Sequence, residues 1–429
     1  MQATISKPAP KVAPNLPDDP AFRREFAWAA AAAELDGLPG GGLNIAHEAV
    51  DRHAAGARAD HVALRCVARD GEVRNVTYAE LSEQTGRFAA ALRALGIRRG
   101  ERVFVLAPRR AELYVAVLGA LKMGAVVSPL FPAFGPEPVL ARMRIGDAAA
   151  LVTTPALYRR KVAPIRGELS GLRHVIGIGN GSDGDADVLD MAELLAAAEP
   201  IDHVERTAPE DLALLHFTSG TTGTPKGALH VHGAVVAHLA TARFALDLHA
   251  EDVFWCTADP GWVTGTSYGI VAPLVCGVTS IVDEGEFDPR RWYEILVRER
   301  VSVWYTAPTA VRMLIRAAST ERGVPPRLPD LRFVASVGEP LDPGAVAWGV
   351  EALGLPIHDN WWQTETGAIM IANTAAAPIA PGSMGCPLPG VEAAVLALGD
   401  DGEPVIRDGR PVLAEDGHEG ELALRRGWP

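Results

Sequence analysis

The chain has few cysteines, few aromatic side chains and no excess of positive charge. Its four cysteines, Cys66, Cys256, Cys276 and Cys386, lie far apart among 429 residues, without the spacing of a metal site or a redox pair. This pattern excludes a disulfide scaffold and predicts reduced thiols in the cytoplasm. Acidic residues number 53 against 40 basic ones, and the resulting net charge of -13 argues against a nucleic-acid partner.

Long apolar runs are also missing. The Ala-rich run 28–33 is far too short to span a bilayer, and the Pro-rich residues 1–20 lack the apolar core of an export signal. We therefore expect no membrane partner. Apolar residues nevertheless make up 48% of the chain, which at this length suffices for two or three compact units with large cores.

The most informative segment is residues 218–227, which read Thr-Ser-Gly-Thr-Thr-Gly-Thr-Pro-Lys-Gly. Glycines let the backbone turn and bring its N–H groups close to a ligand, hydroxyl side chains add donors, and Lys226 adds a positive charge. These features predict a loop that binds polyphosphate. The expected contacts are Thr218, Ser219, Gly220, Thr221, Thr222, Gly223 and Lys226.

This loop differs from a Walker P-loop, which has Gly before the lysine and Ser or Thr after it, where this chain has Pro225 and Gly227. Residues 211–217 and 228–232 on either side both look like short strands, whereas a Walker loop opens into a helix. A Gly/Thr-rich hairpin turn without a ligand is the alternative interpretation.

Apolar strand-like runs alternate with helix-like stretches between residues 103 and 179, and again between 252 and 362. This rhythm predicts an α/β fold with two parallel-rich βαβ sheets. Short strands with Gly/Asp turns after residue 380 predict a small β-barrel-like subdomain. The expected parts are an N-terminal extension (1–40), a first α/β subdomain (41–200), a second one with the phosphate loop (201–379) and the barrel-like unit (380–429).

The loop resembles the signature of the adenylate-forming superfamily, which includes acyl-CoA synthetases, luciferases and the adenylation domains of peptide synthetases. Residues 336–340 (Ser-Val-Gly-Glu-Pro) look like its adenine-contacting strand end, and 361–367 (Trp-Trp-Gln-Thr-Glu-Thr-Gly) like its Thr-Glu motif. With 258–265 (Ala-Asp-Pro-Gly-Trp-Val-Thr-Gly), the tryptophan pair is most similar to AMP-forming acetyl-CoA synthetases. Segments 382–390 and 420–422 also match, so the resemblance covers the chain from about Gly40 to Pro429.

The resemblance implies a short-chain acyl-CoA ligase that uses a small carboxylate, ATP and CoA and forms an acyl-adenylate, AMP and pyrophosphate. Acetate is the first expectation, and propionate or a longer acid the alternative. The anionic reactants require Mg²⁺ and local positive charge. The resemblance implies that Glu365 is the Mg²⁺ ligand and that Lys226 and Thr364 lie beside the phosphates. By itself, Thr364-Glu365 is also typical of a helix N-cap.

The resemblance also assigns nucleotide and acyl contacts. Asp359 and the strand end are expected to hold adenine, and an indole is expected to close the far end of the acyl pocket. A solvated turn and a buried core tryptophan are the respective alternatives. The nucleotide set is Gly338, Glu339, Pro340, Asp359, Asn360, Trp361, Trp362, Gln363 and Thr364, and the acyl set is Val263, Thr264, Val337 and Trp362.

The end of the chain departs from the family pattern. Family members continue into an aspartate that binds the ribose, a hinge and a small C-terminal lid domain with the lysine used in adenylation, whereas this sequence stops at Pro429. We expect that lid domain to be absent, and residues 1–429 to fold but hardly turn over. A non-catalytic nucleotide-binding module is therefore an alternative function.

Three other patterns suggest different chemistry. Residues 265–269 (Gly-Thr-Ser-Tyr-Gly) fit the nucleophile elbow of an α/β-hydrolase with Ser267 and His358, although the turn-like stretch before them lacks the required strand. Residues 179–184 satisfy a dinucleotide-binding glycine pattern but lead into an acidic stretch instead of an apolar helix. His230 and His232 alternate as on a strand without a third ligand, so we assign them no metal.

Overall fold

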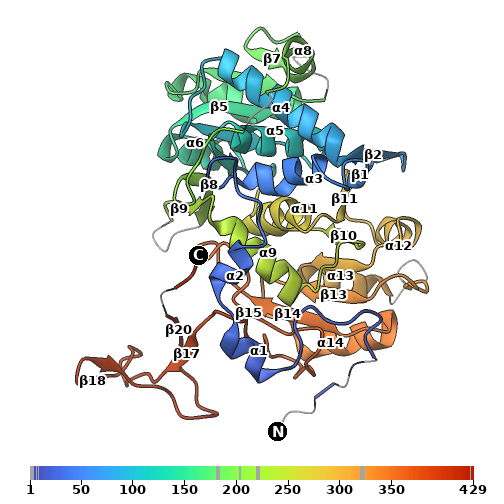
Figure 1. Ribbon diagram of the computed structural model, residues 1–429, viewed down its shortest axis with the longest axis vertical. Helices are drawn as coiled ribbons and strands as arrows, with labels where there is room; N and C mark the ends of the chain where they lie inside the picture. Colours follow the sequence, from blue (N-terminus) through green and yellow to red (C-terminus); the bar gives the residue numbers. More distant parts are fainter. Residues whose placement is uncertain are drawn as a thin grey trace.

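Two large sheets form the framework of the protein, and they occupy the upper and lower parts of Figure 1. The computed structural model describes residues 4–5, 7, 9–179, 184–201, 204–218, 223–318, 324–425 and 427–429. None of the helices in these ranges is long and apolar enough to cross a lipid bilayer.

The upper sheet has seven strands in the order β7-β6-β5-β3-β4-β8-β9. Its strands are parallel except for β9, which pairs with β8 in antiparallel orientation. Every residue of β5 is buried, as expected for an inner strand covered on both faces. The bounds are β3 (Arg102–Leu106), β4 (Val126–Pro129), β5 (Ala148–Thr153), β6 (His174–Gly177), β7 (Val188–Asp190), β8 (Leu212–Thr218) and β9 (Lys226–Val231).

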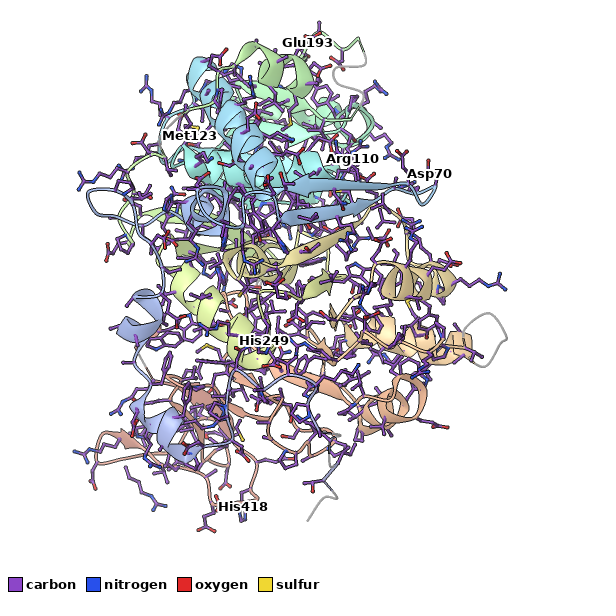
Figure 2. All side chains as sticks on the ribbon, turned by 45° about the vertical axis from the view of Figure 1, so that its right-hand side comes forward. Asp70, Arg110, Met123, Glu193, His249 and His418 are labelled. Atoms are coloured by element: carbon purple, nitrogen blue, oxygen red, sulfur yellow. The ribbon has the colours of Figure 1, made fainter. Side chains whose placement is uncertain are left out.

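The lower sheet has nine strands in the order β16-β15-β14-β13-β12-β10-β11-β1-β2. The run from β14 to β1 is parallel, and antiparallel strands flank it on both sides. Asp70 lies at the tip of the β1–β2 hairpin, which projects from the body (Figure 2). The bounds are β1 (Val62–Val67), β2 (Val73–Thr77), β10 (Val253–Cys256), β11 (Thr279–Asp283), β12 (Val303–Thr306), β13 (Phe333–Ser336), β14 (Ile357–Trp361), β15 (Ile371–Ala372) and β16 (Cys386–Pro387).

The helices begin where capping residues satisfy their first N–H groups. Thr77 and Glu80 form a reciprocal capping box at the start of α4, and Asp288 caps α12 by accepting from the Arg291 N–H. The bounds are α1 (Pro20–Glu25), α2 (Trp28–Ala32), α3 (Arg52–Ala54), α4 (Tyr78–Ala94), α5 (Ala111–Lys122), α6 (Pro136–Ile145), α7 (Pro155–Leu157), α8 (Met191–Ala197), α9 (Ala234–Ala245), α10 (Val263–Thr266), α11 (Ala272–Val275), α12 (Pro289–Arg298), α13 (Pro308–Ala318) and α14 (Pro343–Trp348). The π-helical turns are η1 (His47–Asp51), η2 (Tyr158–Val162), η4 (Ser267–Val271) and η5 (Gly349–Leu353), and η3 (Ala163–Glu168) is 3₁₀.

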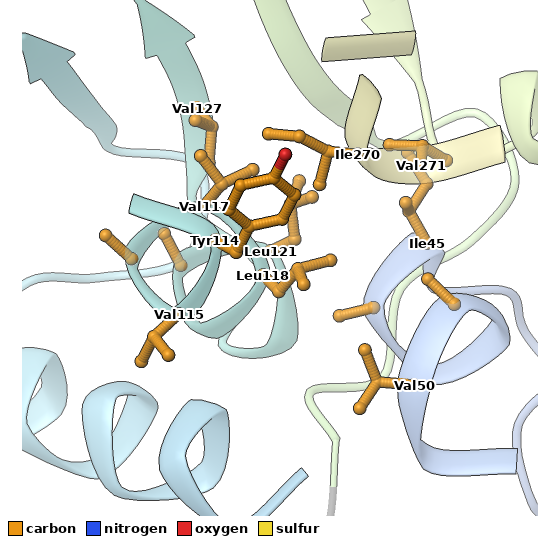
Figure 3. Packing of buried hydrophobic residues seen from close by; sticks show 14 of the residues in the cluster. Ile45, Val50, Tyr114, Val115, Val117, Leu118, Leu121, Val127, Ile270 and Val271 are labelled. Carbon is orange, nitrogen blue, oxygen red and sulfur yellow. The ribbon is translucent and has the colours of Figure 1, made fainter. Parts of the chain in front are cut away.

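Helix α5 lies in the middle of a hydrophobic core that reaches both sheets. Figure 3 shows Tyr114 and Leu118 of this helix near Val127 of β4, Val50 of η1 and Ile270 of η4. The Tyr114 hydroxyl donates to the carbonyl oxygen of Gly269 at 3.3 Å. The same cluster contains residues of β3 and β11, so the two sheets share one core.

The two sheets are not two consecutive halves of the chain. Strands β1 and β2 precede residue 200 but belong to the lower sheet, and β8 and β9 follow it but belong to the upper sheet. The expected boundary near residue 200 therefore does not coincide with the division between the sheets. The division of the chain into domains stays a prediction.

After β16, which still belongs to the lower sheet, residues 393–424 form short antiparallel ribbons at the lower left of Figure 1. Strand β17 (Ala393–Leu396) pairs with β20 (Glu421–Leu424), and β18 (Ile406–Arg407) pairs with β19 (Arg410–Pro411). The expected strands are thus present, and within the described residues 380–425 they do not close into a barrel. Two-stranded ribbons cannot bury both faces, and Ile406 and Leu413 are accordingly exposed.

Candidate active site

The predicted nucleotide and acyl contacts meet at one edge of the lower sheet. Strands β12, β13 and β14 are parallel neighbours, so their carboxyl ends lie at the same edge. Ser336 at the end of β13 stands opposite Asp359 in β14. Residues 337–340 and 362–367, which follow these two strands, therefore emerge side by side, although they lie apart in the sequence.

Asp359 is the most perturbed carboxyl group at this edge. Its side chain is largely buried, and this burial raises its pKa to about 6. Two backbone N–H groups donate to the carboxylate, from Asn360 at 3.0 Å and from Leu341 at 3.4 Å, and both partly oppose the effect of burial. A carboxylate with this pKa at a strand end is a candidate acceptor for a ligand N–H group.

The strand end 338–340 is exposed. The Glu339 carboxylate is already bound, because it accepts from the Thr309 hydroxyl at 2.5 Å and pairs with Arg312, both of α13. Both contacts lower the pKa of Glu339, and the hydrogen bond from Thr309 has the larger effect. The Glu339 carboxylate is thus committed to α13, which leaves the main chain of 338–340 as the group available to a ligand.

The four predicted acyl-pocket residues lie in or beside one apolar cluster. Val337 and Trp362 are buried in it, Val263 packs against it, and Thr264 follows Val263 in α10 and is half-buried. Sequence reasoning missed Tyr268 and Tyr305, which belong to the same cluster. No local signal could have found these tyrosines, because their contact with Trp362 joins segments far apart in the chain.

The predicted phosphate loop closes the β8–β9 hairpin of the upper sheet. Thr218 ends β8 and pairs in register with Lys226, the first residue of β9, whose side chain is exposed. The expected flanking strands are confirmed, and the loop does not lead into a helix. Gly223 has a positive φ of 81° in open space. The predicted contacts Ser219, Gly220, Thr221 and Thr222 lie outside the described residues.

Residues 363–367 form a turn. The backbone N–H groups of Thr366 and Gly367 both donate to the carbonyl oxygen of Gln363 at 3.1 Å, which leaves Thr364 half-buried and Glu365 exposed at the turn. The helix N-cap interpretation is therefore wrong, because no helix follows.

Gly367 is required in this turn. Its φ is +71°, and a Cβ atom there would lie 2.8 Å from the ring of His230. Its carbonyl oxygen accepts from the Ser267 hydroxyl at 2.8 Å and from Nε2 of His238 at 3.1 Å. The indole N–H of Trp428 donates to the carbonyl of Thr366 at 2.8 Å. The turn that presents Glu365 is thus held from three other segments.

These contacts remove the hydrolase alternative. Ser267 begins the π-helical turn η4 directly after helix α10 and not after a strand, and its hydroxyl is buried against the Gly367 carbonyl. His358 is buried elsewhere, where its ring stacks on Phe333 at 4.0 Å between centroids and its Nδ1 donates to the carbonyl of Val334. A Ser-His pair cannot form from these positions.

The two remaining patterns are the pair His230 and His232 and the glycine-rich segment 179–184. Among the residues that the structure describes, no group of three His, Cys, Asp or Glu side chains could hold a metal. The Nδ1 atom of His232 accepts from the Ile45 N–H at 3.1 Å, and His230 lies beside His216 with 5.9 Å between ring centroids. Of the segment 179–184, residues 180–183 lie outside the described residues.

The buried histidines predict a loss of stability in acid. Burial lowers the pKa of His216 to about 3 and that of His238 to about 4. Below about pH 6.5 the unfolded chain binds protons at these side chains and the folded chain does not. The free energy of unfolding therefore decreases as the pH is lowered from about 6.5 to the pKa of the folded state. At pH 5 we expect each to reduce the free energy of unfolding by about 2 kcal/mol.

Urea unfolding at pH 7.5 and pH 5 measures this effect. The His216→Gln variant should lose less stability between the two pH values than the parent does. His418→Gln is the matched control, because this histidine is exposed on the terminal ribbons (Figure 2), and it should leave the difference unchanged. An unchanged difference in His216→Gln as well would contradict the role of buried His216.

The resemblance to adenylate-forming enzymes rests on three of the segments described above, which are the hairpin strands around 218–226, the strand end 338–340 beside Asp359 and the turn 363–367. The chain belongs to the AMP-binding enzyme family, whose model matches residues 50–428. It is 41% identical over 418 residues to the acetyl-coenzyme A synthetase of Bacillus subtilis (strain 168), covering 97% of this chain and 70% of that protein. The synthetase of Methanothrix thermoacetophila is 36% identical, with 91% and 60% covered.

Solved structures agree with this assignment. The crystal structure of Brucella canis acyl-CoA synthetase superposes with a TM-score of 0.85 at 33% identity, covering 95% of this chain and 72% of that chain. The α/β fold with two parallel-rich sheets and the family resemblance are therefore confirmed. The chain spans between 60% and 70% of the length of the two named synthetases.

Proposed function

We propose that the protein activates acetate with ATP and transfers it to CoA. A carboxylate oxygen attacks the α-phosphorus of ATP, the bond to the β-phosphate oxygen breaks, and pyrophosphate leaves with the electron pair. The CoA sulfur then attacks the acyl carbon, the bond to AMP breaks, and the thiol proton is released. The observation that carries the proposal is the meeting, at one sheet edge, of the apolar cluster that contains Trp362 and Val337 with the strand end 338–340.

The phosphate side of the site is proposed to use Lys226 and Thr218 with the hairpin loop between them. A chain with net charge -13 needs such local positive charge to bind a triphosphate and a carboxylate together. The N–H and O–H donors of the loop would stabilise charge on the phosphates in the transition state, and Thr364 would add one more donor.

Mg²⁺ fits the residues at the turn. Glu365 is exposed and forms no ion pair with any side chain in the described ranges, so its carboxylate is available. Mg²⁺ in phosphate-transfer sites is bound by one or two carboxylates together with substrate phosphates, instead of by a cage of protein ligands. We propose Glu365 as the protein ligand, and the ion would neutralise charge on the departing pyrophosphate.

The nucleotide side is proposed to use Asp359 as acceptor for the adenine amine, with the main chain of 338–340 and the segment 360–364 around the nucleotide. The side chains of Asn360 and Trp362 are hydrogen-bonded within the protein. These two residues are therefore proposed to shape the nucleotide site without donating or accepting a hydrogen bond to the nucleotide through their side chains. Trp361 is half-buried and Gln363 exposed, so both are accessible to a ligand.

A pH dependence of nucleotide binding follows from the pKa of Asp359. Because protonation at about pH 6 removes the negative charge and turns one carboxyl oxygen into a donor, we expect the dissociation constant for AMP to rise by up to roughly tenfold between pH 7 and pH 5. Calorimetric titration with AMP measures it. Asp359→Asn keeps an oxygen acceptor without the titration and should bind AMP with little change over this range. Parallel curves for the two proteins would remove Asp359 from the adenine site.

The cysteines support the proposal of a cytoplasmic protein. All four are free, and burial raises the pKa of the Cys66, Cys256 and Cys276 thiols to about 12. Such thiols are inert packing groups and need no oxidising compartment.

The proposed activity is tested with a panel of carboxylates from acetate to benzoate and the full-length protein, scored by formation of AMP and acyl-CoA. We expect acetate to have the highest kcat/KM and propionate the second. A strong preference for medium-chain or aromatic acids would contradict the short-chain proposal. No AMP formation with any acid would contradict the ligase proposal itself.

A further inference from the structure

The indole of Trp362 is held by a chain of buried hydrogen bonds. Its N–H donates to the hydroxyl oxygen of Tyr305 at 3.3 Å. The Tyr305 O–H in turn donates to the Oδ1 atom of Asn360 at 3.0 Å, and the Asn360 amide donates to the carbonyl of Ser336 at 3.1 Å. All four residues are buried. These hydrogen bonds therefore join the carboxyl ends of β12, β13 and β14 to the indole of Trp362.

The Tyr305 hydroxyl is the central member of this chain, because it is both acceptor and donor. Burial raises its pKa well above the usual range, so the hydroxyl keeps its proton at every physiological pH. A buried indole N–H without an acceptor carries the full free-energy cost of its desolvation. The indole therefore strongly prefers the orientation in which its N–H donates to Tyr305.

A second tyrosine restrains the indole from the side. The Tyr268 ring packs edge-on against Trp362 with 5.3 Å between centroids, and against Tyr305 at 5.7 Å. Its own hydroxyl is held by Thr241 at 2.6 Å and by the backbone N–H of Ile369 at 2.7 Å. Tyr268 limits translation of the indole, and the hydrogen bond to Tyr305 is left to set its rotation.

We infer that Tyr305 is a positioning residue for acyl-chain selection, which holds the indole of Trp362 across the end of the acyl pocket. The inference rests on the proposed function and adds to it a residue that no motif indicates. Tyr305 acts through Trp362 and is not proposed to touch the substrate. Without its hydroxyl, the indole turns toward another partner and the pocket end opens.

Tyr305→Phe in the full-length protein tests the inference, with kcat/KM measured for acetate, propionate and butyrate. We expect the ratio of butyrate to acetate to rise roughly three- to tenfold, the effect of losing one net hydrogen bond at a buried site. The KM for ATP should stay within about twofold, because Asn360 keeps its hydrogen bond to the Ser336 carbonyl when the Tyr305 hydroxyl is removed. Tyr293→Phe is the matched control, since the Tyr293 hydroxyl is buried without a hydrogen-bond partner among the described residues. It should leave the ratio unchanged.

The double variant Tyr305→Phe/Trp362→Gly separates positioning from general loosening of the fold. If Tyr305 acts through the indole, its replacement should not change the acid profile further once the indole is gone. The inference would be overturned if the double variant had a higher ratio of kcat/KM for butyrate over acetate than Trp362→Gly alone. It would also be overturned if Trp362→Gly changed this ratio and Tyr305→Phe did not. An unchanged profile in Trp362→Gly would instead reject the proposed pocket on which the inference rests.

Discussion

Replacing Glu365 by alanine should lower kcat/KM for every carboxylate alike, by roughly a hundredfold or more. The side chain stands exposed at the turn 363–367, where it makes no ion pair with a described residue. Its removal therefore costs the fold little, and the loss falls on the placement of Mg²⁺ beside the phosphates. The measurement is acyl-CoA formation at increasing Mg²⁺ concentration, together with binding of Mg²⁺ and ATP by calorimetry.

Glu286→Ala is the matched control for this variant. Glu286 is also an exposed carboxylate, which among the residues that the structure describes pairs with the exposed Arg69, and its loss should change neither turnover nor the Mg²⁺ requirement. A Glu365→Ala protein that is active with the same Mg²⁺ dependence as the parent would remove Glu365 from the metal site.

Trp362→Gly should reverse the preference of the enzyme for short acids. The indole is 8% exposed and lies in the cluster with Val337, so its removal opens a space at the end of the pocket. Each methylene that enters contributes about 0.8 kcal/mol, which makes the ratio of kcat/KM for pentanoate over acetate rise by roughly tenfold or more. Steady-state kinetics on the full-length protein with acids from two to six carbons measures the ratio.

The stability of this variant has to be measured alongside, because loss of a buried tryptophan costs about 3–5 kcal/mol. Trp348→Gly serves as control, since this half-buried indole packs in a different core cluster and its loss should leave acid preference unchanged. A Trp362→Gly protein with the parent's ratio of long to short acids would show that the indole does not end the acyl pocket.

Local sequence patterns determined most secondary structure of this protein and the position of its motifs along the chain. The apolar runs at 103–106, 149–153, 253–256 and 333–336 are strands, and 308–318 is a helix, within a residue of the expected bounds. The phosphate loop was expected between two strands and closes a hairpin. These elements are predictable because hydrophobic period, turn residues and caps act over a few neighbouring residues.

Only the tertiary structure decided which strands share a sheet. Strand β1 pairs with β11 and β8 with β4, and both partnerships cross the boundary that the order of elements suggested near residue 200. A strand carries the same alternation or apolar run whichever neighbour it joins, so pairing over such distances depends on how the helices between the sheets pack, which no local pattern records.

The same reason explains the side chains at the site. The sequence placed Ser267 in a nucleophile pattern and Asn360 among the nucleotide contacts, whereas the fold binds the Ser267 hydroxyl to the Gly367 carbonyl and the Asn360 amide to Tyr305 and Ser336. The sequence by itself determined the family, the loop and the order of its motifs. The partner of Ser267 lies a hundred residues away in the sequence, and the partners of Asn360 lie on neighbouring strands. Only the tertiary structure decided these orientations, because a buried polar group takes whichever partner the packed fold brings within hydrogen-bond distance.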